Sequence, residues 1–250
     1  MLRGQRLNML DSALAPRFQW YKHAIRQEVI AMRPFTRSFG LVFLATLAAV
    51  TAQADSIQAG HYVEAELHSS RALVISQKSP GADHPDTAEK LNNQALLYYT
   101  QGKYAEAEPL FKRALAIREK TLGADHPLTA ETLNNLALLY DSLGKYAEAE
   151  PLFKRAMAVR EKALGADHPS TATSLNNLAL LYDSLDKYAE AEPLFKRALA
   201  IVEKALGAEH PKVAVTLDNY AELLRKMNRE AEAIKLESRA KKIRAKADEK

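Results

Sequence analysis

Apolar residues recur along most of this chain at the spacing of helices that bury one face. Between Pro127 and Leu143 the large or small apolar positions are 133, 136, 137 and 140, which lie on one helical face. The same spacing follows from Tyr146 through positions 149, 153, 156 and 157. Gly144 supplies a tight turn between the two stretches, and Pro169 opens the next one, as suits the first helical position. The pattern therefore predicts a pair of helices.

This helix pair is one unit of an internal repeat. Residues 103–144 and 145–186 agree at 35 of 42 positions, and glycine and histidine recur with the same period. The recurring residues are Gly81, Gly123, Gly165 and Gly207, and His84, His126, His168 and His210. One helix pair cannot bury its own apolar face, whereas stacking the next pair on it can. The sequence therefore predicts an all-α fold of stacked helix pairs.

The first 54 residues differ from the repeats and predict an export signal. Arg33 and Arg37 precede an uncharged apolar stretch of 12 residues, 39–50, followed by Ala-Gln-Ala up to Ala54. A basic region, a short apolar region and an A-x-A site are typical of a secretory signal peptide. The stretch is too short for a membrane span, which needs about 20 residues. We expect cleavage after Ala54 and a periplasmic or secreted protein with no stable membrane span. An uncleaved membrane anchor is the alternative, and Met32 is a candidate for the true start.

The rest of the chain divides into three segments. Residues 55–80 match only the second helix of a unit and form a half repeat. Residues 81–245 hold about four units, and residues 246–250 are a polar tail. In the last unit, Glu237 and Lys241 replace apolar residues of the second helix, which predicts a solvated cap at that end.

Charge and composition argue against several function classes. The formal net charge is +4, but 7 of the 35 basic residues and only 2 of the 31 acidic residues precede Asp55. The remaining chain is close to neutral, so nothing in it favours nucleic acid. The sequence contains no cysteine, no phosphate-binding glycine loop and no His-Glu-x-x-His. Its acids, serines and histidines recur in register, whereas a catalytic site is a single asymmetric constellation. We expect no enzyme and no cofactor.

The repeated histidines raise the question of a metal site. Each histidine directly precedes a proline at the start of a helix, and the copies are separated by whole helix pairs. Neighbouring helix axes are about 8–10 Å apart, whereas zinc needs several ligands at about 2 Å. The spacing favours helix capping, and no metal site is predicted.

The unit resembles the tetratricopeptide (TPR) repeat. The TPR order of large, large, small, aromatic, Gly, aromatic, small, aromatic and small residues is matched by Leu133, Leu136, Ala137, Tyr140, Gly144, Tyr146, Ala149, Phe153 and Ala156. The 42-residue period and the segment Leu-Asn-Asn-Leu-Ala-Leu-Leu-Tyr are similar to the kinesin light chain type. The resemblance implies a TPR solenoid, a right-handed superhelix of stacked antiparallel helix pairs, with the first helices lining a concave groove. Motor transport is not carried over, because no sustained heptad pattern is present.

The resemblance also implies that repeated asparagines bind the backbone of a peptide in this groove. The candidates are Asn92, Asn93, Asn134, Asn135, Asn176, Asn177 and Asn219. An amide suits this role because it offers a donor and an acceptor to an extended chain. A second role stays open: one asparagine of each pair hydrogen-bonds between neighbouring helices and holds the stack in register.

Two functions from different classes follow from these observations. The first is a non-catalytic module of the cell envelope that binds an extended peptide or a partner protein in the groove. The second is a self-associating structural scaffold of the envelope, a homo-oligomer that pairs through its half repeat. The asparagine row favours the first function, and apolar positions in the half repeat favour the second.

Overall fold

The computed structural model describes residues 82–248, and the structural statements below refer to these residues. The predicted leader (1–54) and half repeat (55–80) lie outside the described residues. The chain divides into two compact units, residues 1–67 and 68–250, and every described helix belongs to the second unit.

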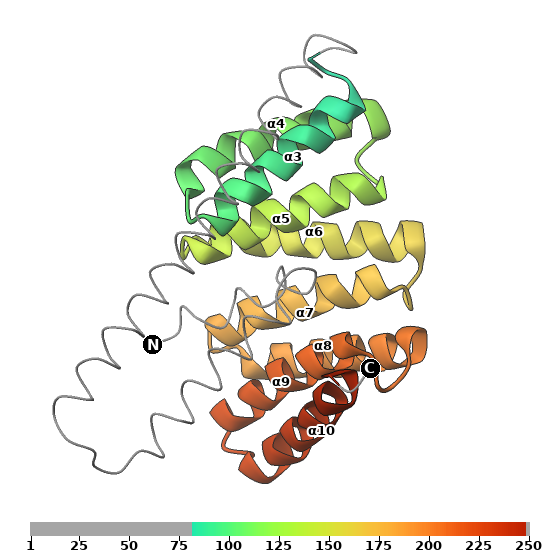
Figure 1. The fold of residues 1–250 in the computed structure, drawn as a ribbon. Helices are drawn as coiled ribbons and strands as arrows, with labels where there is room; N and C mark the ends of the chain where they lie inside the picture. Colours follow the sequence, from blue (N-terminus) through green and yellow to red (C-terminus); the bar gives the residue numbers. More distant parts are fainter. Residues whose placement is uncertain (1–81, 249–250) are drawn as a thin grey trace, which may run out of the picture. The chain divides into compact units, whose positions relative to one another are not determined.

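The described residues form eight helices in four consecutive pairs, with no strand among them (Figure 1). The first helices of the pairs are α3 (Pro85–Thr100), α5 (Pro127–Ser142), α7 (Pro169–Ser184) and α9 (Pro211–Lys226). The second helices are α4 (Tyr104–Leu122), α6 (Tyr146–Leu164), α8 (Tyr188–Leu206) and α10 (Glu230–Asp248). The all-α prediction is confirmed. Helix α10 continues to Asp248, so residues 246–248 of the predicted polar tail are helical.

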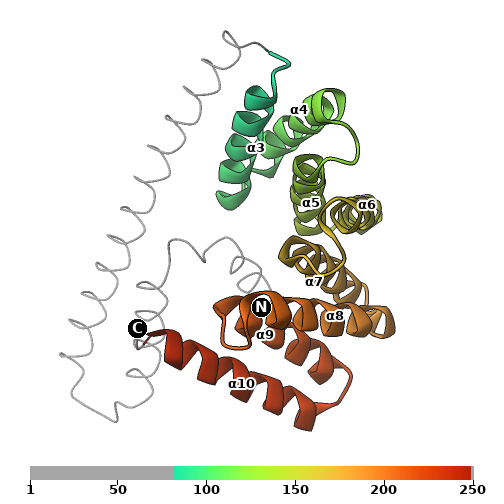
Figure 2. The ribbon, with the colours of Figure 1, turned by 90° about the vertical axis from the view of Figure 1, so that its right-hand side faces the viewer.

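The helices form two layers. Each helix packs against its partner in the pair, and α4, α6 and α8 also pack against the first helix of the next pair. The odd-numbered helices contact one another along the array, whereas no two described even-numbered helices contact each other as extensively. In Figure 2, α3, α5 and α7 lie on one side of the array, and α4, α6 and α8 lie on the other. This arrangement is a solenoid of stacked helix pairs, as predicted.

Each odd-numbered helix begins with the same cap. Nδ1 of the preceding histidine accepts a hydrogen bond of 3.1–3.2 Å from the backbone N–H two residues later. The four capping residues are His84, His126, His168 and His210. The bond satisfies an N–H group that has no partner inside the helix. The capping role predicted for the histidines is confirmed.

The turn inside each pair requires a residue with positive φ. Gly102 and Gly144 adopt φ of 74° and 72° there, while Asp186 and Asn228 adopt 57° and 59° at the same place in the third and fourth pairs. Asp and Asn are the side-chain-bearing residues that tolerate this left-handed conformation best. The turn geometry is therefore retained in the two pairs that lack the glycine.

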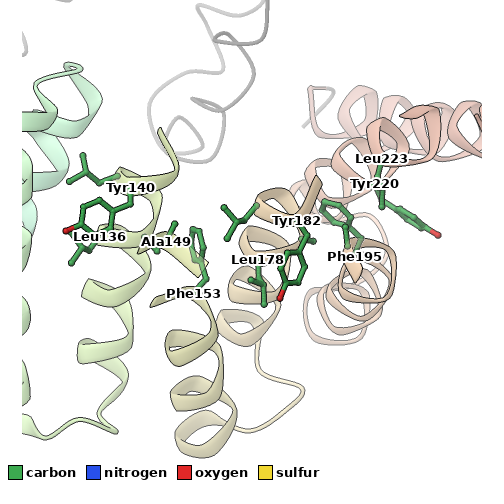
Figure 3. Packing of buried hydrophobic residues seen from close by; sticks show 14 of the residues in the cluster. Leu136, Tyr140, Ala149, Phe153, Leu178, Tyr182, Phe195, Tyr220 and Leu223 are labelled. Atoms are coloured by element: carbon green, nitrogen blue, oxygen red, sulfur yellow. The ribbon is translucent and has the colours of Figure 1, made fainter. Parts of the chain in front are cut away.

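The core runs from pair to pair between the layers (Figure 3). Phe111, Phe153 and Phe195 of the even-numbered helices are at most 1% exposed. Between α8 and α9, the rings of Phe195 and Tyr220 stack with centroids 6.1 Å apart. Burial of one such phenylalanine stabilises the fold by roughly 1.5–3 kcal/mol. Because these contacts join each pair to the next, the stability of a pair depends on its neighbours.

The last helix replaces this apolar contact with charge. Glu237 takes the position of Phe195 in α10 and accepts a hydrogen bond of 2.8 Å from Nη2 of Arg225. Lys241, at the position of Leu199, is exposed. The solvated cap predicted for this end of the array is confirmed.

Candidate functional site

Each odd-numbered helix carries a stripe of accessible residues. In α5 they are Leu128, Glu131, Asn135, Leu138 and Ser142. Their spacings of three, four and seven residues place them on one face. The equivalent positions are 86, 89, 93, 96 and 100 in α3, 170, 173, 177, 180 and 184 in α7, and 212, 215, 219, 222 and 226 in α9. All of them are exposed or half-buried except Asn177. We call these twenty positions the open stripe.

Asparagines along the edge of the open stripe join neighbouring odd-numbered helices. In each bond, Nδ2 of the second asparagine of one repeat donates to Oδ1 of the first asparagine of the preceding repeat. The three bonds are Asn135 to Asn92 (3.2 Å), Asn177 to Asn134 (2.9 Å) and Asn219 to Asn176 (3.2 Å). We call this row of bonds the asparagine ladder. It links all four described repeats.

A second set of contacts has the same offset as the ladder. Tyr99 Oη lies 2.9 Å from Ser142 Oγ, and Lys226 Nζ lies 2.6 Å from Asp183 Oδ2. In both pairs, as in the ladder, the partners are 43 residues apart. Neighbouring odd-numbered helices therefore share one fixed register, displaced by one residue from the 42-residue sequence repeat.

The ladder decides how far the predicted asparagines are accessible. Four of them are buried: Asn92, Asn134, Asn176 and Asn177. Three remain exposed or half-buried: Asn93, Asn135 and Asn219. The register role left open by the sequence is present at every candidate except Asn93, which forms no ladder bond with another described residue. Peptide binding stays a prediction, and accessibility favours it at the three exposed or half-buried residues.

The middle of the ladder keeps unused hydrogen-bonding groups. Asn176 Nδ2 and Asn177 Oδ1 are buried and have no hydrogen-bond partner. Each side chain uses its other polar atom in a ladder bond. An unpaired buried polar group costs about 1–3 kcal/mol, so each of these two atoms lowers the stability that the ladder contributes.

A row of leucines runs beside the ladder. Leu96, Leu138 and Leu180 occupy the same open-stripe position in α3, α5 and α7, and each is half-buried against the core. In α9 the position is Glu222. The open stripe therefore presents apolar side chains on three successive helices, with an accessible amide group beside the leucine on α3 and α5.

Buried arginines of the even-numbered helices hydrogen-bond to the odd-numbered helices that follow them. The sequence analysis did not identify these contacts. Arg118 of α4 is 2% exposed and donates through Nη1 to the Leu128 carbonyl oxygen (2.6 Å) and to Thr132 Oγ1 (2.7 Å). Arg160 of α6 makes the same contacts in the next repeat, and burial lowers the pKa of its guanidinium group. The position of Arg118 in the sequence could have indicated its burial, because residue 118 lies seven residues after Phe111 and so on the same, buried face of the helix.

Tyrosine and glutamate side chains join each pair to the next at the other end of the helices. Tyr140 donates to Glu108 Oε1 (3.0 Å), and Tyr182 donates to Glu150 Oε1 (3.2 Å). Lys112 and Lys154, one turn after these glutamates, hydrogen-bond to them and lower the pKa of each carboxyl group.

The third glutamate of this kind, Glu192, has the most hydrogen-bonding partners. Glu192 Oε1 accepts hydrogen bonds from Tyr220 (2.9 Å) and Arg229 (2.7 Å), and Lys196 Nζ lies 2.8 Å away. The bonds from Lys196 and Arg229 lower the pKa of Glu192 from 4.5 to about 2. Burial and the neighbouring carboxylate raise the pKa of Tyr220. The ionised form of Glu192 therefore contributes to the contact between α8 and α9.

Residues 82–248 hold neither a metal-binding cluster nor a candidate membrane span. No cluster of three or more His, Asp or Glu side chains is arranged to hold a metal ion there. No described helix has both the length and the apolar character needed to cross a membrane.

One family model matches most of the chain. The family model described as "Tetratricopeptide repeat" matches residues 52–120, 86–162, 142–204 and 184–246. Together these matches run without a gap from residue 52 to residue 246. No curated protein matches the sequence.

Several solved structures are similar to this chain. One is described as "Podosopora anserina putative kinesin light chain nearly identical TPR-like repeats", with 29% identity, a TM-score of 0.62 and coverage of 76% of this chain and 90% of that one. Another is BtubC (BKLC) from P. vanneervenii, with 26% identity, a TM-score of 0.67 and coverage of 82% of each chain. MamA, with 17% identity, a TM-score of 0.51 and coverage of 72% of this chain and 89% of that one, shares the fold.

The asparagine ladder generates a stability prediction. We expect Asn134→Ala to lower the free energy of unfolding by about 1–3 kcal/mol, because it leaves the buried Asn177 Nδ2 without an acceptor. Asn93→Ala is the matched control, since Asn93 is exposed and outside the ladder; its effect should stay within about 0.5 kcal/mol. Urea denaturation followed by circular dichroism measures both. Equal stability of the two variants would contradict a structural role for the ladder.

The Glu192 cluster generates a prediction about pH. Because the folded-state pKa lies below the ordinary value, the ionised carboxyl stabilises the array above about pH 4.5, and this contribution is lost as pH falls toward 2. Glu192→Gln should therefore be less stable than the natural chain at neutral pH, with the difference shrinking as the pH falls through this range. Unfolding curves over a pH series check this, with Glu190→Gln, an exposed carboxylate in the same helix, as control. A difference that is constant with pH would refute the assignment.

Proposed function

The chain belongs to the tetratricopeptide repeat family, whose repeats typically mediate protein–protein interaction without catalysis, and from this membership we propose that its open stripe binds an extended segment of a partner protein. The observation that carries the proposal is the row of half-buried leucines on the open stripes of α3, α5 and α7, with an accessible amide side chain beside the leucine on α3 and α5. Leucine offers an apolar anchor to a ligand side chain, and the amide offers hydrogen bonds to its backbone.

The spacing of the helices suits an extended ligand. Packed helices have axes about 8–10 Å apart, and an extended chain advances about 3.3 Å per residue. About three ligand residues therefore span one repeat, so that a single segment meets each odd-numbered helix in turn.

Photo-crosslinking in the cells that produce the protein tests this function. A photoreactive phenylalanine derivative at Leu138, on the open stripe, should form adducts with another protein that mass spectrometry identifies. Ala158 is the matched control, an exposed position on the even-numbered helix α6. Thermal melts confirm that both variants fold.

The outcomes separate the two functions proposed from the sequence. Adducts with a different protein at Leu138 and not at Ala158 support segment binding. Adducts only between copies of this chain favour the self-associating scaffold. Similar labelling at both positions, or none at Leu138, overturns segment binding at the open stripe.

We also propose that the protein works in the cell envelope. The support is the sequence pattern of residues 33–54, a basic region followed by a short apolar stretch and an A-x-A site. Sequencing the N-terminus of protein isolated from its own cells checks this, and Asp55 is the expected first residue. A mature chain that begins well before Asp55 would contradict cleavage, and its recovery from washed membranes would point to the anchor instead.

A further inference from the structure

The charges on the open stripe change sign from the first odd-numbered helix to the last. The stripes of α3 and α5 carry only acidic charges: Asp86, Glu89 and Glu131. The stripe of α7 is uncharged: Ser170, Thr173, Asn177, Leu180 and Ser184. The stripe of α9 carries Lys212, Lys226 and Glu222. The formal charge of the five positions thus runs from −2 through −1 and 0 to +1 along the array.

Neighbouring groups neutralise the acidic end only in part. Glu89 lies 3.4 Å from the adjacent Lys90, and both side chains are exposed. Glu131 accepts a hydrogen bond of 3.2 Å from Asn92 Nδ2, which places its carboxylate beside the ladder. Its contact with Arg118 is long, 3.5 Å, and 42% of its side chain remains exposed. The carboxylates of α3 and α5 are therefore accessible to a ligand cation.

The last helix offers the opposite charge. Lys212 is exposed and forms no ion pair with another described residue. Lys226 forms an ion pair with Asp183, in which Nζ lies 2.6 Å from Oδ2. Glu222 is half-buried at the position that holds leucine in the other three helices. The accessible cation at this end is consequently Lys212, with Lys226 and Glu222 farther along the same stripe.

We propose that the open stripe selects extended segments whose charges run in the complementary order, with lysine or arginine over α3 and α5, uncharged residues over α7 and an acidic residue near Lys212 of α9. The inference rests on the proposed function and adds which segments bind and in which direction they lie. Leu138 and Leu180, between the two charged ends, supply the apolar contact for the uncharged middle of the segment.

Distance keeps the two charged ends independent. With axes about 8–10 Å apart, α3 and α9 are separated by roughly 25–30 Å. This is well beyond the Debye length of about 8 Å at physiological ionic strength. Each end therefore responds only to ligand charges directly over it. A segment bound in the reverse direction would place like charges together at both ends, which is how electrostatic complementarity suppresses wrong orientations.

Selection from a phage-displayed library of random peptides tests the proposal with the full-length chain as the immobilised target. Enriched peptides are expected to carry Lys or Arg in one half and Asp or Glu in the other. Fluorescence anisotropy then measures the binding of one enriched peptide and of a variant with its charges exchanged end for end. The exchanged peptide should bind more weakly, and the difference should shrink at high salt.

Paired substitutions identify which charged side chains of the open stripe contact the peptide. Glu89→Gln with Glu131→Gln should weaken binding of the enriched peptide by roughly two- to fivefold per carboxylate, the size of an exposed ion pair. Glu106→Gln with Glu148→Gln is the matched control, because it makes the same charge change at exposed positions of the even-numbered helices. Lys212→Glu should weaken binding as well, through the other end of the peptide.

The possible results distinguish this inference from the function on which it rests. Peptides enriched without a charge order, or an equal loss in both double variants, would overturn the charge-order inference and leave segment binding standing. Failure to enrich any peptide, together with no adduct at Leu138, would overturn both.

Discussion

The structure depends on one constraint, which is that no helix pair can bury its own apolar face. Phe153 and Ala149 of α6 are hidden only because α5 covers them on one side and α7 on the other. Every pair must therefore present the same apolar surface to the pair before it and to the pair after it. This requirement accounts for the near-identity of the repeats, and it accounts for the change at α10, where Glu237 and Lys241 can face solvent because no described helix follows.

The asparagine ladder adds a polar constraint to this apolar one. Hydrophobic contact is non-directional, so it brings neighbouring pairs together without fixing how they slide along each other. Hydrogen bonds such as Asn177 to Asn134 require a definite register, and all of them connect residues 43 apart. The ladder thereby sets the spacing and alignment of the open stripes. A surface with a leucine at the same position of three successive helices can recognise a regular ligand only if that alignment is fixed.

The sequence predicted the helices, their order, the histidine caps and the solvated end, because each depends on local spacing or on the 42-residue period. It could not decide the role of the asparagines. Asn92 and Asn135 lie at different positions of the repeat, and only the packing of α5 on α3 shows that one bonds to the other. Arg118 was missed for a similar reason: among glutamates and lysines it is typical of a solvated helix, and its acceptors on α5 become evident only when the pairs are stacked.

The differences between the two most similar repeats distinguish positions that are restricted by packing from positions that are free to vary with the ligand. At positions buried between the pairs, residues 103–144 and 145–186 differ by conservative changes, such as Ile117 to Val159 and Thr132 to Ser174. At open-stripe positions the changes alter the chemistry, as in Glu131 to Thr173. A buried position must fit two neighbouring pairs at once, so a change of polarity there would leave a group unsatisfied. An open-stripe position has no such restriction, and the information that distinguishes one ligand from another is therefore expected where the repeats disagree.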